Sequence, residues 1–243
     1  MLDLLTKYAA GKKCHFYFTP DSKKDCKEAV VLVHGLMRRS SNMYGLGKWL
    51  ANQGYRVYVY DYQTSQDGIA GHGQKLRKYL KKVCSELPEE MPLHMVTHSM
   101  GGIITRYALA KSQDDDLFDS GRINRIVMLG PPHGGSDLAR FAAKYLPFTV
   151  KMFQPIAELS SEAKAAVHDS PVIEGPEVGV VAGKYDLQVS VKYTFMPGIK
   201  DHIVLKSEHS LMMKMPHVRD ACLEFLQKGK FSPHFQDAPV IAL

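Results

Sequence analysis

A serine stands where an apolar run breaks, in the stretch HSMGG at positions 98–102. The run 93–96 before it has the length of a strand, and the apolar spacing after it is helical. A serine at the apex of a sharp strand-to-helix turn is held in a strained backbone conformation, with its hydroxyl raised above the sheet edge. The pattern therefore predicts that Ser99 is a nucleophile. The backbone N–H of Met100, at the helix start, would point at developing negative charge.

The residues two positions before and two after this serine need to be small, because strand and helix approach closely there. Gly101 meets the need on the helix side. Thr97 stands on the strand side, where the best-known form of the turn has glycine. We expect the packing around Thr97 to be looser or adjusted, and a glycine to be tolerated at this position.

A second loop suited to this chemistry follows the apolar run 29–33, in the sequence His34-Gly35-Leu36. Gly35 can adopt a backbone conformation that turns the N–H of Leu36 toward the serine. With the N–H of Met100 this predicts a two-donor oxyanion hole, in which each donor contributes about 2.7–4 kcal/mol. His34 is expected to brace the loop.

A serine hydroxyl is a poor nucleophile until a base removes its proton, and the base needs a third group to orient it. After a serine in this kind of turn, the acid follows a late strand and the histidine follows the final one. Asp186 lies just beyond the strand-like run 178–182, and His209 follows the run that ends near Lys206. We therefore predict Asp186 as the acid and His209 as the base.

Other histidines and aspartates compete for these roles. His98 adjoins the serine, but adjacent residues on a tight turn point apart. His133 lies in a loop after another strand, which it is expected to shape. His202 and Asp201 stand at the start of the last predicted strand, too early to reach its carboxyl end. Asp61, after the run YRVYVY, remains an alternative acid.

These residues need a sheet to position them. Several apolar runs of strand length are nearly continuous in β-branched and aromatic residues, which suits strands covered on both faces. They alternate with helical stretches, and this predicts a single α/β domain over residues 1–243 with a mostly parallel central sheet flanked by helices. The strand-like runs begin at Cys14, Ala29, Tyr55, Leu93, Ile123, Val178 and His202, and the helical stretches are 42–52, 71–84, 100–111 and 217–227.

One segment departs from this alternation. Residues 136–175 hold helical fragments broken by prolines, and the segment is too long for a plain loop in a compact domain. We predict a small helical, lid-like insertion, with an ordinary crossover helix as the alternative. Its apolar side chains would suit an aliphatic acyl chain or would pack the lid onto the body. The candidate substrate contacts are Phe141, Tyr145, Leu146, Phe148 and Phe153.

Four stretches of this chain resemble the α/β-hydrolase superfamily, and within it the small bacterial lipases and esterases. VLVHGL is similar to their oxyanion loop, THSMGG to their GHSMGG turn, and LGPPHGGSDLA to their GTPHxGSxLA segment. The tail from Asp186 to Met213 resembles the part that supplies acid and histidine. The resemblance covers residues 29–231. It implies Ser99 as nucleophile, Asp186 as acid, His209 as base, and Leu36 and Met100 as oxyanion donors.

The resemblance also implies a reaction: hydrolysis of carboxylic esters through an acyl-enzyme, with no metal or organic cofactor. An acyl thioesterase uses the same triad, so a thioester remains an alternative substrate. The alternative from another class is a binding protein that keeps the fold without turnover. It predicts that at least one catalytic element is missing, yet every element has a candidate in this sequence.

The composition is that of an ordinary globular protein of 243 residues, 45% apolar and 23% charged, with four scattered cysteines at no metal-binding spacing. The net charge of +6 is spread along the chain, so no nucleic-acid partner is expected. Lysines and an apolar lid would favour transient contact with a lipid surface. No run approaches eighteen apolar residues and no secretory signal is visible, so we expect a cytoplasmic protein.

Overall fold

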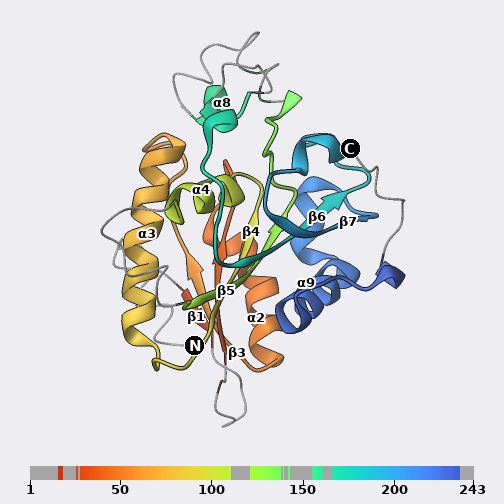
Figure 1. Cartoon of the computed structure of the whole chain (residues 1–243). Coiled ribbons are helices and arrows are strands. Elements are labelled where there is room, and N and C mark those ends of the chain that lie inside the picture. The colour runs from red at the N-terminus through yellow and green to blue at the C-terminus, as the bar shows by residue number, and fades with distance from the viewer. Residues whose placement is uncertain are drawn as a thin grey trace.

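The central element of the computed structural model is a seven-stranded sheet with the order β1-β3-β2-β4-β5-β6-β7 (Figure 1). The structure describes residues 16–18, 26, 28–110, 121–137, 139, 142, 155–160 and 166–235. Strands β2 to β7 are parallel to their neighbours, and β1 pairs antiparallel with β3. The strands are β1 Phe16–Phe18, β2 Glu28–Val33, β3 Tyr55–Tyr60, β4 Leu93–His98, β5 Ile123–Leu129, β6 Glu177–Gly183 and β7 Ile199–Leu205.

The central strands are buried on both faces, which explains their nearly continuous apolar sequences. Every residue of β4 is buried, and in β2 only Glu28 is not. Each of the predicted strand-like runs forms a strand, so the predicted α/β class with a mostly parallel sheet is confirmed. The last strand starts three residues earlier than expected, at Ile199, which leaves Asp201 and His202 near its amino end.

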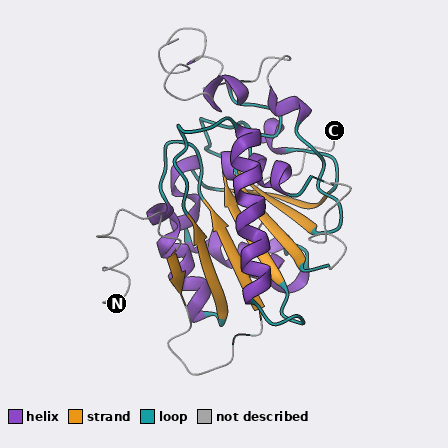
Figure 2. Cartoon of the chain, turned by 90° about the vertical axis from the view of Figure 1, so that its left-hand side faces the viewer, coloured by secondary structure: helices purple, strands orange, loops and turns teal. Residues whose placement is uncertain are grey.

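Helices cover both faces of the sheet, and each pair of helices shares a core with one face. Helices α3 (Ile69–Glu86) and α4 (Met100–Ala108) pack on one side, and α2 (Tyr44–Asn52) and α9 (Pro216–Lys228) on the other (Figure 1). Figure 2 shows the long helix α3 in front of the strands. None of the helices described here has the length and apolarity needed to cross a bilayer.

The segment 136–175 that was expected to form a lid is described in part. Its short helix α8 (Pro155–Glu158) lies beyond the carboxyl edge of the sheet (Figure 1). The N–H of Ser136 donates to the carbonyl oxygen of Leu159 over 2.8 Å. The carboxylate of Glu158 accepts the N–H of Ile69 over 2.6 Å, at the first turn of α3. A carboxylate is favourable at a helix N-terminus, so this bond fastens the segment to the body of the fold.

Candidate active site

Ser99 occupies the turn between β4 and α4, at the carboxyl edge of the sheet. Its backbone has φ 55° and ψ −127°, a combination that residues other than glycine rarely adopt. Two backbone bonds hold the turn: Ser99 N–H donates to the carbonyl of Leu129 over 2.8 Å, and Gly102 N–H donates to the carbonyl of Ser99 over 2.9 Å. Such a conformation costs about 1–3 kcal/mol and persists only where the surroundings enforce it. The strained turn predicted at this serine is present.

Two glycines let neighbouring backbone approach the serine. A Cβ atom on Gly35 would lie 2.8 Å from the Cβ of Ser99. A Cβ atom on Gly101 would lie 2.8 Å from the carbonyl oxygens of Val33 and His34. A side-chain carbon does not approach another carbon or a carbonyl oxygen that closely, so a larger residue at either position would push the end of β2 and the loop after it away from the serine turn.

Thr97 fits beside the serine turn because it packs against a glycine, Gly102, and its surroundings are not loosely packed. Its side chain is fully buried, and within the described residues its hydroxyl has no hydrogen-bond partner. A Cβ atom on Gly102 would lie 3.4 Å from the Thr97 hydroxyl and 3.0 Å from the side chain of Pro131. The absence of a side chain at Gly102 therefore leaves space for the side chain of Thr97. The absence of a side chain at Gly101 allows the helix to approach β2.

The loop after β2 presents the predicted oxyanion donor, Leu36. Met37, the next residue, has φ 54°, and in the part of the chain that the structure describes it and Ser99 are the two non-glycine residues with positive φ. The N–H of Met37 donates to the hydroxyl of Thr64 over 3.2 Å, which anchors the loop. Within the same residues, the N–H groups of Leu36 and Met100 have no acceptor. Both N–H groups thus meet one requirement of the predicted oxyanion hole, and the two non-glycine residues with positive φ, Met37 and Ser99, lie at this site.

His34 braces this loop, as predicted. Its ring stacks on Tyr62 with 4.2 Å between ring centroids, and the Tyr62 hydroxyl donates to the His34 carbonyl over 2.7 Å. Its Nδ1 donates to the carbonyl of Gly35 over 3.0 Å. Burial lowers the pKa of His34 to about 4, so the ring is neutral at ordinary pH.

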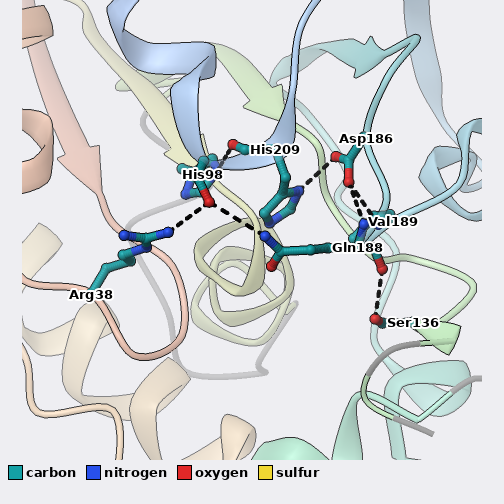
Figure 3. A network of polar contacts seen from close by, with 8 residues as sticks. Arg38, His98, Ser136, Asp186, Gln188, Val189 and His209 are labelled. Atoms are coloured by element: carbon teal, nitrogen blue, oxygen red, sulfur yellow. Dashed lines mark hydrogen bonds and ion pairs between the residues drawn. The ribbon is translucent and has the colours of Figure 1, made fainter. Parts of the chain in front are cut away.

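Asp186 and His209 are in direct contact. They follow the neighbouring strands β6 and β7, and His209 Nδ1 lies 2.6 Å from Asp186 Oδ2 (Figure 3). The other oxygen, Oδ1, accepts the N–H groups of Gln188 and Val189, each over 2.8 Å. A carboxylate can only accept, so Nδ1 carries the hydrogen and Nε2 is left free to take a proton.

Gly130 makes room for this pair. It follows β5 and has φ 55°. A Cβ atom there would lie 3.2 Å from both Asp186 Oδ2 and His209 Nδ1. Glycine suits the position twice: it adopts the left-handed backbone without strain, and it leaves the space that the acid and the histidine occupy.

His98, the histidine next to the serine, contacts the backbone of His209. Its Nε2 donates to the carbonyl oxygen of His209 over 2.8 Å, and the two rings are 4.8 Å apart (Figure 3). Burial, together with the nearby His209 ring, lowers the pKa of His98 to about 3. His98 is thus a neutral donor that holds the loop of the other histidine.

The remaining competitors make other contacts. His133 Nδ1 accepts from the guanidinium of Arg106 over 3.3 Å, and His202 contacts the hydroxyl of Thr194 over 2.8 Å. Asp201 accepts the N–H of Phe231 over 2.7 Å at the amino end of β7. These groups hold loops and ends of the fold together.

A cavity of about 490 Å³ opens beside Ser99, His98 and His209. Most of its other lining is apolar and comes from three regions: the loop after β2, the loop after Asp186 and the segment 136–175. The lining residues are Leu36, Met37, Arg38, Ser136, Ala139, Ala142, Ile156, Leu159, Gln188 and Val189.

The substrate contacts predicted from sequence stay a prediction. Phe141, Tyr145, Leu146, Phe148 and Phe153 lie outside the described residues. Segment 136–175 lines the cavity through other residues, which the sequence analysis did not single out: Ser136, Ala139, Ala142, Ile156 and Leu159. Gln188 and Val189 also line the cavity. Their position just after the predicted acid, Asp186, was the one sequence signal that could have indicated them as cavity residues.

Residues 24–178 match the model of the serine aminopeptidase family S33. The chain belongs to this family. The matched region includes the loop after β2 and the serine turn and ends before Asp186 and His209. The predicted membership of the α/β-hydrolases is confirmed.

Solved structures share the fold. The mature lipase BlEst2 of Bacillus licheniformis has a TM-score of 0.69 at 17% identity, over 89% of this chain and 98% of that chain. The esterase Pf2001 of Pyrococcus furiosus has 0.57 at 16% identity, over 91% and 94%. The type II thioesterase YbtT of the yersiniabactin pathway has 0.58 at 14% identity, over 88% and 96%. These likenesses agree with an α/β-hydrolase similar to the small lipases and esterases.

Proposed function

We propose that this protein hydrolyses carboxylic esters, as a lipase or esterase, with Ser99 as nucleophile, His209 as base and Asp186 as acid. One observation carries the proposal: Ser99, with its strained backbone, and His209 line the same mostly apolar cavity, and Nδ1 of His209 is hydrogen-bonded to Asp186. A buried carboxylate–histidine pair beside a serine on a sharp turn is the arrangement that activates a hydroxyl.

The reaction proceeds in two halves. His209 Nε2 removes the proton of the Ser99 hydroxyl as its oxygen attacks the ester carbonyl, and the N–H groups of Leu36 and Met100 stabilise the oxyanion. His209 then gives the proton to the departing alcohol, which leaves an acyl-Ser99. A water molecule deprotonated by the same histidine attacks that acyl group, and the acid is released as Ser99 regains its proton.

The cavity supports an acyl substrate of moderate size. Its volume of about 490 Å³ lies within the range of small-molecule sites, about 300–1,000 Å³. Ile156, Leu159 and Val189 give it an apolar wall that an aliphatic chain would contact. The contribution of Phe141 and the other aromatic candidates of the lid segment stays a prediction.

A thioester is the second candidate, because YbtT shares the fold and the same triad cleaves thioesters. The substrate class is tested with 4-nitrophenyl esters from acetyl to palmitoyl, alongside the acyl-CoA thioesters of the same chains. A short-chain optimum indicates an esterase, activity on dispersed long chains a lipase, and a preference for the CoA compounds a thioesterase.

The nucleophile is tested by Ser99→Ala, which should reduce kcat by at least about 10³-fold while the protein stays folded. Ser207→Ala is a matched control: Ser207 is also buried, lies two residues before His209, and its hydroxyl has no hydrogen-bond partner among the described residues. It should keep its activity. Turnover retained by Ser99→Ala would overturn the mechanism, and no turnover of any ester by the wild type would favour a binding protein.

A further inference from the structure

A polar bridge joins the three loops of the candidate active site. Arg38 lies two residues after Leu36, Ser210 directly follows His209, and Gln188 lies two residues after Asp186. Arg38 Nη2 donates to the Ser210 hydroxyl over 2.6 Å, and Gln188 Nε2 donates to the same oxygen over 3.3 Å. Figure 3 shows Arg38 and Gln188 approaching from opposite sides. Both side chains line the cavity together with Ser99.

Arg38 brings a positive charge into this mostly apolar cavity, and no carboxylate of the described residues pairs with it. Its side chain is half-buried, and among the described residues its one polar contact is the neutral hydroxyl of Ser210. By contrast, Arg125 pairs with Glu177 over 2.8 Å. A guanidinium has five N–H donors in a planar fork, so most of the donors of Arg38 remain for a ligand. The fork matches the oxygens of a carboxylate or a phosphate.

The position of Arg38 indicates which part of a substrate it would meet. Its guanidinium contacts Ser210, the residue that follows His209. In the proposed reaction, His209 protonates the leaving oxygen, so the groups beside it lie on the side where the alcohol departs. An anion attached to the alcohol part of an ester would therefore come within reach of Arg38.

We infer that Arg38 is a specificity residue that binds a carboxylate or phosphate on the leaving-group side of the ester. This inference rests on the proposed ester hydrolysis. A different role for Arg38 would be to position His209 through Ser210. A positioning residue would affect every ester alike, whereas a residue that binds an anion affects the charged esters selectively.

The test compares three butyryl esters with the same acyl group: those of 4-hydroxybenzoate, of 4-hydroxyphenyl phosphate and of methyl 4-hydroxybenzoate, which is neutral. For Arg38→Met, the ratio of kcat/KM on an anionic ester to that on the neutral ester should fall about 10- to 100-fold relative to wild type. Intrinsic reactivities cancel because variants and wild type are compared on the same esters. The two anionic esters show whether carboxylate or phosphate is preferred.

Two further variants complete the design. Arg38→Lys keeps the charge but not the fork, so its ratio should lie between those of wild type and Arg38→Met. Arg39→Met removes the same charge from an exposed neighbour that does not line the cavity, and it should leave the ratio unchanged. Equal losses on charged and neutral esters would overturn the inference in favour of positioning. The 4-nitrophenyl monoester of adipate carries its charge on the acyl side. A selective loss of activity by Arg38→Met on this ester would show that Arg38 does not act on the leaving-group side.

Binding without turnover separates this inference from the proposed function. Calorimetry with 4-hydroxybenzoate and phenyl phosphate on Ser99→Ala should give a Kd that weakens about 10- to 100-fold when Arg38→Met is added. An unchanged Kd, or no binding by Ser99→Ala, overturns the inference even if Ser99-dependent hydrolysis is found. A weakened Kd supports it even if hydrolysis is absent.

Discussion

The Nε2 of His98 lies 2.8 Å from the carbonyl oxygen of His209, so the strand that carries Ser99 also holds the loop of the proposed base. The contact joins β4, at the centre of the sheet, to the segment after β7 at its edge. A hydrogen bond from a fully buried donor restricts where the backbone of His209 can lie. His98 is therefore a positioning residue in the proposed mechanism.

Replacing this donor should weaken catalysis without removing any group that reacts. His98→Phe leaves the buried carbonyl of His209 without its partner, at a cost of about 1–3 kcal/mol. We expect kcat on a neutral 4-nitrophenyl ester to fall about tenfold, with KM little changed. His94→Phe makes the same change at the opposite end of β4, and its activity should be retained. Equal losses in the two variants would mean that the effect is on folding.

The assignment of the acid is tested by a pair of isosteric changes. Asp186→Asn preserves an oxygen for the N–H groups of Gln188 and Val189 but presents an amide to His209, which favours the wrong ring tautomer. A loss of about 10³- to 10⁴-fold in kcat is expected. Asp201→Asn, at the far end of β7, should change kcat by less than about threefold. A larger loss for Asp201→Asn than for Asp186→Asn would show that the acid is misassigned.

Thr97→Val should stabilise the protein. The Thr97 hydroxyl is buried without a partner in the described chain, and such a group costs about 1–3 kcal/mol. Valine has nearly the same shape and no hydroxyl, so the free energy of unfolding should rise by about 1 kcal/mol in urea titrations. Ester hydrolysis should be unchanged. A marked loss of activity with the fold intact would instead give the hydroxyl a role in the chemistry.

Stability should fall as the pH is lowered through the range of histidine titration. Burial lowers the pKa of His34, His94 and His202 to about 4, and burial with the nearby His209 lowers that of His98 to about 3. Histidines of the unfolded chain titrate near pH 6.5, so between about pH 6.5 and 4 the unfolded state binds more protons. Each histidine then destabilises the fold by up to about 1.4 kcal/mol per pH unit as the pH falls.

Urea unfolding at pH 7.5, 6 and 5 measures this slope above the titration range of most carboxylates. His202→Gln removes one of these four histidines. The free energy of unfolding should then fall less steeply with decreasing pH, by the contribution of one histidine. Equal free energies of unfolding at pH 7.5 and pH 5 would contradict the prediction.

Much of the sheet and the turn at Ser99 could be predicted from sequence, because parallel strands buried on both faces are nearly continuous in apolar residues. The contact between Asp186 and His209 also follows from position along the chain. Each comes just after a late strand, and the carboxyl ends of parallel strands meet at one edge of the sheet. Their catalytic role stays a prediction.

The cavity lining and the contacts of His98 and Arg38 could not be predicted. The acceptor of His98 is 111 residues away in the chain, and no local pattern indicates which carbonyl a buried ring will meet. Arg38 lies beside Arg39 in sequence, yet one lines the cavity and the other is exposed. Side-chain direction in an irregular loop depends on the tertiary contacts around it, here the strained Met37 and the hydroxyl of Ser210.

The strand order has a consequence for synthesis on the ribosome. Ser99 follows a central strand whose two neighbours are β2 and β5, so the nascent chain can form the serine turn before β6 and β7 have been synthesised. Its proposed base arrives only with the edge strand β7. In the proposed mechanism Ser99 is therefore inactive until the final strand docks, and hydrolysis that appears during refolding would report the time at which β7 docks.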